Sequence, residues 1–140
     1  MKDPLSLIVL TGCLCLAFSI GLAWCLTGIK YLELRLLKGI FPGYQNLVKA
    51  HVDFAIKAAL LFAIYLVFSR LNTKAPQLII SALCAGAILN PGGFIVLSIK
   101  PDISSHPLSV FGMVMTISFM SATVGYIGSI WIIVTRIING

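Results

Sequence analysis

The chain has 140 residues, of which 59% are hydrophobic and only 10% are charged, and its mean hydropathy is +1.06. A soluble domain carries roughly a quarter charged residues, so this composition excludes a soluble globule and predicts a protein embedded in a bilayer. Ten basic residues against four acidic ones give a net charge of +6. Cations spread along so apolar a chain indicate anchors beside the membrane and not a surface that binds nucleic acid.

Four apolar segments are long enough to cross the hydrocarbon, which takes about 20 residues as a helix. In chain order they span residues 4–29, 47–69, 77–98 and 108–138. The first connection, residues 30–50, mixes charged side chains with Leu and Tyr and is typical of a segment in the membrane interface. No linker divides residues 1–140. The sequence therefore predicts an all-α, multi-pass integral membrane protein of one domain, a compact antiparallel four-helix bundle expected in the bacterial inner membrane.

Two further features of these segments concern orientation and packing. Basic residues are nearly balanced between the two sides, so the positive-inside rule does not set the orientation. Small residues recur at the four-residue spacing that lets membrane helices pack closely, and they would serve contacts within one bundle or between bundles equally well. They are Cys15 and Ser19 in the first span, Ala82 and Gly86 in the third, and Ser121, Gly125 and Ser129 in the fourth.

Three ionisable side chains, His51, Asp53 and Lys57, fall inside the second span. Ionisable groups at membrane depth are costly and normally face a bundle interior or a wet cavity. Asp53 and Lys57 are four residues apart with the acid first, which favours an ion pair along the helix. A purely structural role for that pair remains an alternative. His51 lies about 200° around the helix from Asp53, so we expect it to address a different neighbour.

The third span carries the sequence Asn90-Pro91-Gly92-Gly93. Pro91 deletes a backbone donor and leaves the carbonyl of Ala87 without its helical partner. We predict a break in the helix and a cavity beside Asn90, because broken helices at membrane depth survive where the freed backbone faces protein or water. A simple kink for packing is the alternative.

The histidine of the second span has several possible roles. At 1.5 Å per residue, His51, Asn90 and the loop that carries His106 fall in the same half of the membrane, a convergence typical of a binding site. A neutral imidazole there can ligate haem iron, relay protons or be a hydrogen-bonded core group. His106 lies in a loop, so haem held by two histidines of the spans is not expected.

Two stretches resemble a known family. Residues 47–51 (Leu-Val-Lys-Ala-His) with Asp53 and Lys57 resemble the second-helix motif of the styrene oxide isomerase and hydroxylaminobenzene mutase family, and Asn90-x-Gly92-x-Phe94 with the later Pro101 resembles its third helix and the turn that follows. The similarity covers about residues 44–138, in order and with similar spacing.

The resemblance implies a small four-helix membrane enzyme that works as a homotrimer. Its histidine, here His51, would be the axial ligand of a haem b held at subunit interfaces. Ferric iron would act as a Lewis acid on the oxygen of a small apolar, aromatic substrate, stabilising the charge that develops there. Lys49 would pair with a haem propionate.

The same resemblance assigns catalytic roles to Lys57, Asn90 and Asp53, and a place in the substrate pocket to Phe94 and Gly92. The chain departs from the isomerase pattern at three positions: Lys57 replaces an Asn, Phe94 replaces a Tyr and Gly86 replaces an Asp. Asp53 is nearer the mutase version of the motif. The alternatives are a non-catalytic haem-binding or electron-transfer protein, a membrane anchor subunit of a larger complex, and a structural bundle with His51 in its core.

Overall fold

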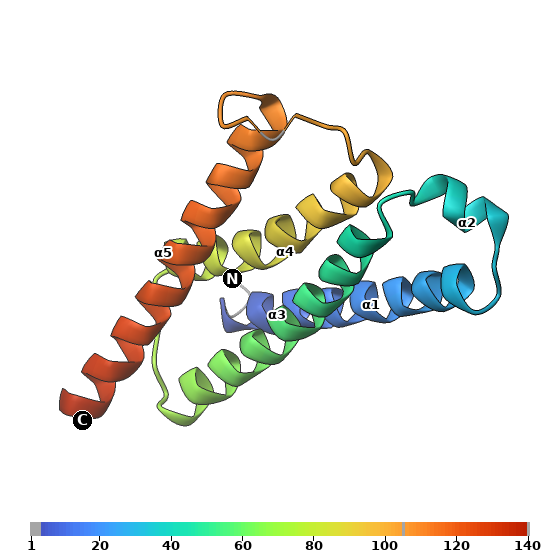
Figure 1. Ribbon diagram of the computed structural model, residues 1–140. Coiled ribbons are helices and arrows are strands. Elements are labelled where there is room, and N and C mark those ends of the chain that lie inside the picture. Colours follow the sequence, from blue (N-terminus) through green and yellow to red (C-terminus); the bar gives the residue numbers. More distant parts are fainter. Residues whose placement is uncertain (1–3, 105, 140) are drawn as a thin grey trace.

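The computed structural model describes residues 4–104 and 106–139, and its elements there are five helices with no strand (Figure 1). Four are long and apolar enough to cross a membrane: α1 (Leu5–Lys30), α3 (Tyr44–Arg70), α4 (Gln77–Ile99) and α5 (Val110–Asn139). The shortest, α4, has 23 residues and is about 35 Å long, which exceeds the roughly 30 Å of hydrocarbon. The prediction of an all-α membrane bundle is therefore confirmed.

The connection between the first two spans contains a helix that the sequence did not predict as one. This helix, α2 (Arg35–Ile40), has six residues and folds back between the end of α1 and the start of α3 (Figure 1). Helix α3 begins at Tyr44, three residues before the predicted start of the second span.

The long helices pack as neighbouring pairs. Helix α1 lies along α3, α3 lies along α4, and α4 lies along α5, while the contact between α1 and α4 is smaller. The amide of Gly43 donates a hydrogen bond of 2.8 Å to the carbonyl of Ser98, which ties the start of α3 to the end of α4. His51, near the start of α3, and Asn90, in the second half of α4, therefore lie toward the same end of the bundle.

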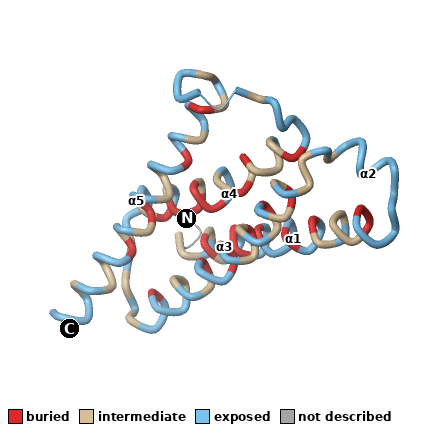
Figure 2. Tube along the Cα trace, viewed as in Figure 1, coloured by how far each residue is buried: buried red, intermediate tan, exposed pale blue. Residues whose placement is uncertain are grey.

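Buried residues lie on the sides of the helices that face one another, while many residues on the outward sides are exposed (Figure 2). Phe54, Leu61 and Leu83 are almost completely buried. The outer surface of α5 is apolar as well, since Met120 is 65% exposed and Ile127 is 62% exposed. An apolar outer surface around an apolar core is what a helix bundle in lipid requires, so the chain is a multi-pass membrane protein.

Small residues bring α4 and α5 into close contact within the chain. A Cβ on Gly86 would lie 2.6 Å from the Cα of Ala122, and a Cβ on Gly125 would overlap the backbone of Leu83. The Ser129 hydroxyl donates to the carbonyl of Gly125 at 2.7 Å and is buried. Residues of two of the predicted small-residue motifs thus serve the intramolecular α4–α5 interface, as close packing in lipid requires.

The predicted break at Asn90-Pro91-Gly92-Gly93 is wrong, because α4 continues through these residues to Ile99. The carbonyl of Ala87, which Pro91 deprives of its helical donor, accepts a bond from the thiol of Cys15 on α1 at 3.7 Å. Cys15 and Pro91 are both fully buried. A neighbouring helix thus supplies the missing donor, which is one way in which a proline is tolerated inside a membrane helix.

Candidate functional site

His51 faces α1. Its Nδ1 lies 2.9 Å from the carbonyl oxygen of Ser19 and 3.1 Å from the Ser19 hydroxyl, which itself donates to the carbonyl of His51 at 3.1 Å. A carbonyl only accepts, so Nδ1 carries the proton in this arrangement. The bond from Nδ1 fixes the ring against α1, and the bond from the Ser19 hydroxyl ties the backbone of α3 to the same residue.

The other ring nitrogen is left free for a ligand. Among the residues that the structure describes, Nε2 of His51 has no hydrogen-bond partner. The ring borders a groove of about 310 Å³ lined by Ser19, Ile20, Ala23, Trp24 and Thr27 of α1. Trp24 is 72% exposed, so this groove opens on the outer surface of the bundle. A histidine whose Nδ1–H is held by a carbonyl and whose Nε2 is free has the arrangement of a metal-ligating imidazole.

Asp53 faces α4, whereas His51 faces α1, as their angular separation on α3 predicts. Its Oδ2 accepts a bond of 3.0 Å from Nδ2 of Asn90 on α4, and its Oδ1 lies 3.7 Å from Nζ of Lys57. The side chains of Lys57 and Asp53 are 14% and 20% exposed. Asp53 thus compensates the Lys57 ammonium and holds the Asn90 amide, which makes this ion pair part of the bundle interior.

Tyr126 of α5 completes this group, and the sequence reasoning missed it. The Lys57 ammonium lies 5.2 Å from the centre of its ring, and the Tyr126 hydroxyl is buried with no hydrogen-bond partner in the described structure. We call Asp53, Lys57, Asn90 and Tyr126 the polar cluster. A signal was present in the sequence, because membrane tyrosines concentrate at the interfaces whereas Tyr126 lies near the middle of α5.

The structure brings some predicted site residues together and separates others. Asp53, Lys57 and Asn90 converge, but His51 lies on the side of α3 that faces α1. Lys49 is exposed, and its ammonium lies 6.0 Å from the centre of the Phe94 ring on α4. Because Lys49 is two residues before His51, it lies about 200° around the helix from it. Lys49 is therefore not beside the groove at His51 in the same chain.

The two residues predicted for a substrate pocket also face different neighbours. Gly92 borders an apolar cavity of about 440 Å³ between α4 and α5, whose other walls include Leu89, Phe111 and Met115. Phe94 lies against Lys49 instead. His106 is exposed, and its Nδ1 accepts a bond from the amide of Leu108 at 3.3 Å. Neither Phe94 nor His106 borders this cavity.

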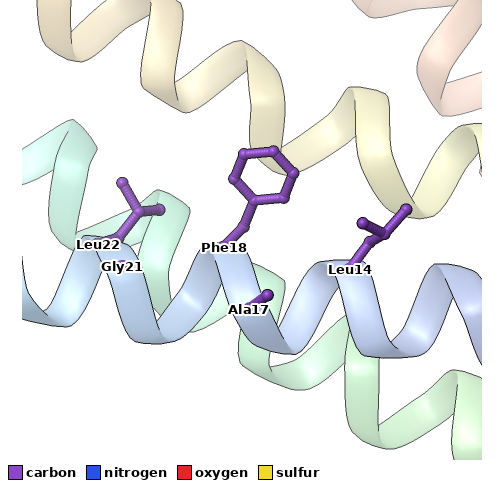
Figure 3. A pocket seen from close by; sticks show the side chains of 5 residues that line it. All are labelled: Leu14, Ala17, Phe18, Gly21 and Leu22. Carbon is purple, nitrogen blue, oxygen red and sulfur yellow. The ribbon is translucent and has the colours of Figure 1, made fainter.

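A further apolar groove of about 350 Å³ runs along α1 and contains none of the predicted site residues. Leu14, Phe18 and Leu22 point the same way from α1, with Ala17 and Gly21 between them (Figure 3). The Phe18 ring stacks on Phe54 of α3 with centroids 5.3 Å apart. These three concave surfaces, at His51, at Gly92 and at Phe18, are lined mainly by apolar side chains, which suits apolar ligands that arrive through the bilayer.

The donor set around His51 limits the kind of metal that it could hold. Within residues 4–104 and 106–139, no three His, Cys, Asp or Glu side chains form a group that could hold a metal ion. A lone imidazole suits an iron whose equatorial ligands belong to a porphyrin, with histidine as the axial ligand. Within the described residues, His51 thus offers a single imidazole and not a set of side chains for a bare metal ion.

Fold and site together define the class of the protein: an all-α, multi-pass membrane protein with one histidine oriented toward an outward groove and a polar cluster inside the bundle. No protein-family model matches the chain, and neither a curated protein nor a solved structure matches it.

Proposed function

We propose that this chain binds haem b through Nε2 of His51 and isomerises a small apolar, aromatic substrate in the membrane. The observation that supports this most is the bond from Nδ1 of His51 to the Ser19 carbonyl, which leaves Nε2 free beside an open groove. Bound ferric haem would supply a Lewis acid that polarises a substrate oxygen. The resemblance to the styrene oxide isomerase and hydroxylaminobenzene mutase family gives the reaction class.

In this proposal the chain's own residues orient the ligand and exclude water. Ser19 fixes the plane of the His51 ring and keeps the proton on Nδ1, which raises the basicity of the ligating nitrogen. Ile20, Ala23 and Trp24 provide an apolar wall on one side of the groove. Because the groove opens outward, a second copy of the chain would have to close it, in keeping with a homotrimer in the bacterial inner membrane.

Catalytic roles for Lys57, Asn90 and Asp53 are a separate part of the proposal. These side chains already satisfy one another inside the bundle, and they face away from the groove at His51. They would act on a substrate only if it enters between α3 and α4. That separation favours a second candidate function, a haem-binding protein without catalysis that transfers electrons or anchors a larger complex.

The first experiment is a visible spectrum of the protein purified in mild detergent from haem-replete cells. We expect a strong haem band that is lost in His51→Ala. The matched control is His106→Ala, which removes the exposed histidine of the α4–α5 loop and should leave the band unchanged. Colourless protein, or a band that survives His51→Ala, would refute haem binding through His51.

The second experiment separates the two candidate functions in protein that carries haem. Conversion of styrene oxide or phenylhydroxylamine to an isomer, without added reductant, is expected from the isomerase. Loss of that conversion in Asn90→Ala with a retained haem band would assign Asn90 to the reaction. A reversible redox couple with no turnover of either compound would instead identify the non-catalytic haem protein.

A further inference from the structure

The short helix α2 is fixed at a defined level of the bundle. The amide of Leu34 donates a bond of 3.0 Å to the carbonyl of Gly28 in the last two turns of α1. A Cβ on Gly28 would lie only 2.7 Å from Cδ1 of Leu37, so α2 packs directly on the backbone of α1. Helix α2 is therefore held beside the end of α1.

That end of α1 lies at the boundary between hydrocarbon and headgroups. Helix α1 has 26 residues and is about 39 Å long at 1.5 Å per residue. The hydrocarbon is about 30 Å thick, so the ends of α1 extend into the headgroup layers. Trp24, 72% exposed and one turn before Gly28, occupies the position of an interfacial anchor. Helix α2 consequently lies at headgroup level.

Helix α2 presents three different faces at this level. Leu37 faces α1, as does Leu34 immediately before the helix. Leu36 and Ile40, four residues apart and therefore on one face, are 73% and 44% exposed.

The third face of α2 is basic. Arg35 and Lys38 are three residues apart and both exposed, and neither has an ion-pair partner among the described residues. Lys30 lies nearby in sequence with its ammonium 5.4 Å from the centre of the Tyr31 ring, and Glu33 is the one acidic residue of this segment. The segment from residue 30 to residue 40 is thus a net cationic surface next to exposed apolar side chains.

We propose that α2 binds an anionic phospholipid, with its phosphate at Arg35 and Lys38 and its acyl chains against Leu36 and Ile40. Arginine offers a planar set of donors that matches a phosphate. A lipid with net negative charge is favoured over a zwitterionic one, because no headgroup cation opposes the unpaired Arg35 and Lys38. This inference is independent of haem and of the reaction proposed above.

Native mass spectrometry of the detergent-solubilised chain, titrated with phosphatidylglycerol or phosphatidylcholine of identical acyl chains, tests the proposal. The first phosphatidylglycerol should bind more tightly than the first phosphatidylcholine. Each lost cation should weaken its binding by roughly fivefold, so R35Q/K38Q should weaken it on the order of 25-fold. R70Q/K74Q, which removes two exposed cations at the opposite end of the bundle, is the matched control and should retain most of the affinity.

Hydrogen exchange of the unaltered chain locates the lipid even if R35Q/K38Q does not fold. Phosphatidylglycerol should protect the amides of Arg35–Ile40 more than phosphatidylcholine does, and R35K/K38R should keep the preference because it keeps both charges. Equal binding of the two lipids, equal protection by them, or equal losses in R35Q/K38Q and R70Q/K74Q would overturn the proposal.

Discussion

The contact between the Cys15 thiol and the Ala87 carbonyl gives a specific prediction about the continuity of α4. Pro91 has no N–H to offer the Ala87 carbonyl, and the Cys15 thiol donates to that carbonyl at 3.7 Å. Cys15→Ala removes this donor from a buried carbonyl and also loses the packing of the sulfur, so we expect it to cost about 1–3 kcal/mol in total. Cys15→Ser keeps a donor at the same place and should cost less than Cys15→Ala.

A double-mutant cycle separates this hydrogen bond from the loss of sulfur packing. In Pro91→Ala, residue 91 regains an N–H that can bond to the Ala87 carbonyl, so Cys15 is no longer needed there. The cavity left by Cys15→Ala is common to both backgrounds and cancels in the cycle. Side-chain hydrogen bonds between membrane helices average about 0.6 kcal/mol and reach about 1.7 kcal/mol, so we expect a coupling energy in that range.

The assay is reversible unfolding in mixed micelles with increasing sodium dodecyl sulfate, followed by far-UV circular dichroism. Cys15→Ala should lower the free energy of unfolding more in the parent chain than in Pro91→Ala. If Cys15→Ala costs the same in both backgrounds, the thiol does not replace the donor that Pro91 removes. The continuity of α4 would then need another explanation.

Three other predictions use the same unfolding assay. Asp53→Ala leaves the Lys57 ammonium without its counter-charge and should cost about 3–5 kcal/mol of unfolding free energy. The control D53N/K57M keeps an oxygen for Asn90 and removes both charges, so it should cost much less. Equal losses in the two variants would contradict the ion pair. Asn90→Ala removes the donor to Asp53 and should cost about 1–3 kcal/mol, and a neutral result would mean that this bond adds nothing. Gly86→Ala forces α4 and α5 apart and should cost about 1–3 kcal/mol of unfolding free energy. Gly21→Ala is the control and should cost nothing, because no atom lies within 4 Å of the added Cβ. Similar losses in the two variants would contradict the close packing of α4 on α5.

The spans could be predicted from the sequence because membrane crossing depends on length and hydrophobicity, which are local properties. The prediction failed at Pro91 because the outcome depends on a partner in another helix. A freed carbonyl predicts a break only if no donor reaches it, and the donor here, Cys15, is 72 residues away in the chain. Helix α2 was predicted only as an interfacial segment, because six residues are too few to show a helical pattern and the packing of Leu37 on Gly28 is a contact that the sequence does not reveal.

The part of the candidate site that could be predicted is the direction in which each side chain leaves α3, because that direction depends only on the spacing of residues along one helix. The period of 3.6 residues separates His51 from Asp53, and the structure gives them partners on α1 and α4 respectively. Ser19 and Tyr126 as partners were not predictable, because which faces of α1 and α5 meet α3 depends on packing of the whole bundle. Spacing in sequence therefore identified the chemical groups but not the pocket that each one borders.

The separation of His51 from the polar cluster has a consequence for how function and stability respond to mutation. Asp53 and Lys57 compensate each other's charge inside the bundle, so removing Asp53 alone should destabilise the fold. His51 bonds to Ser19 through Nδ1 only, and its free Nε2 contributes no intramolecular hydrogen bond to the described structure. Substitutions at His51 should therefore change the proposed haem binding at a small cost in folded yield, whereas Asp53→Ala should lower the folded yield without altering the groove at His51.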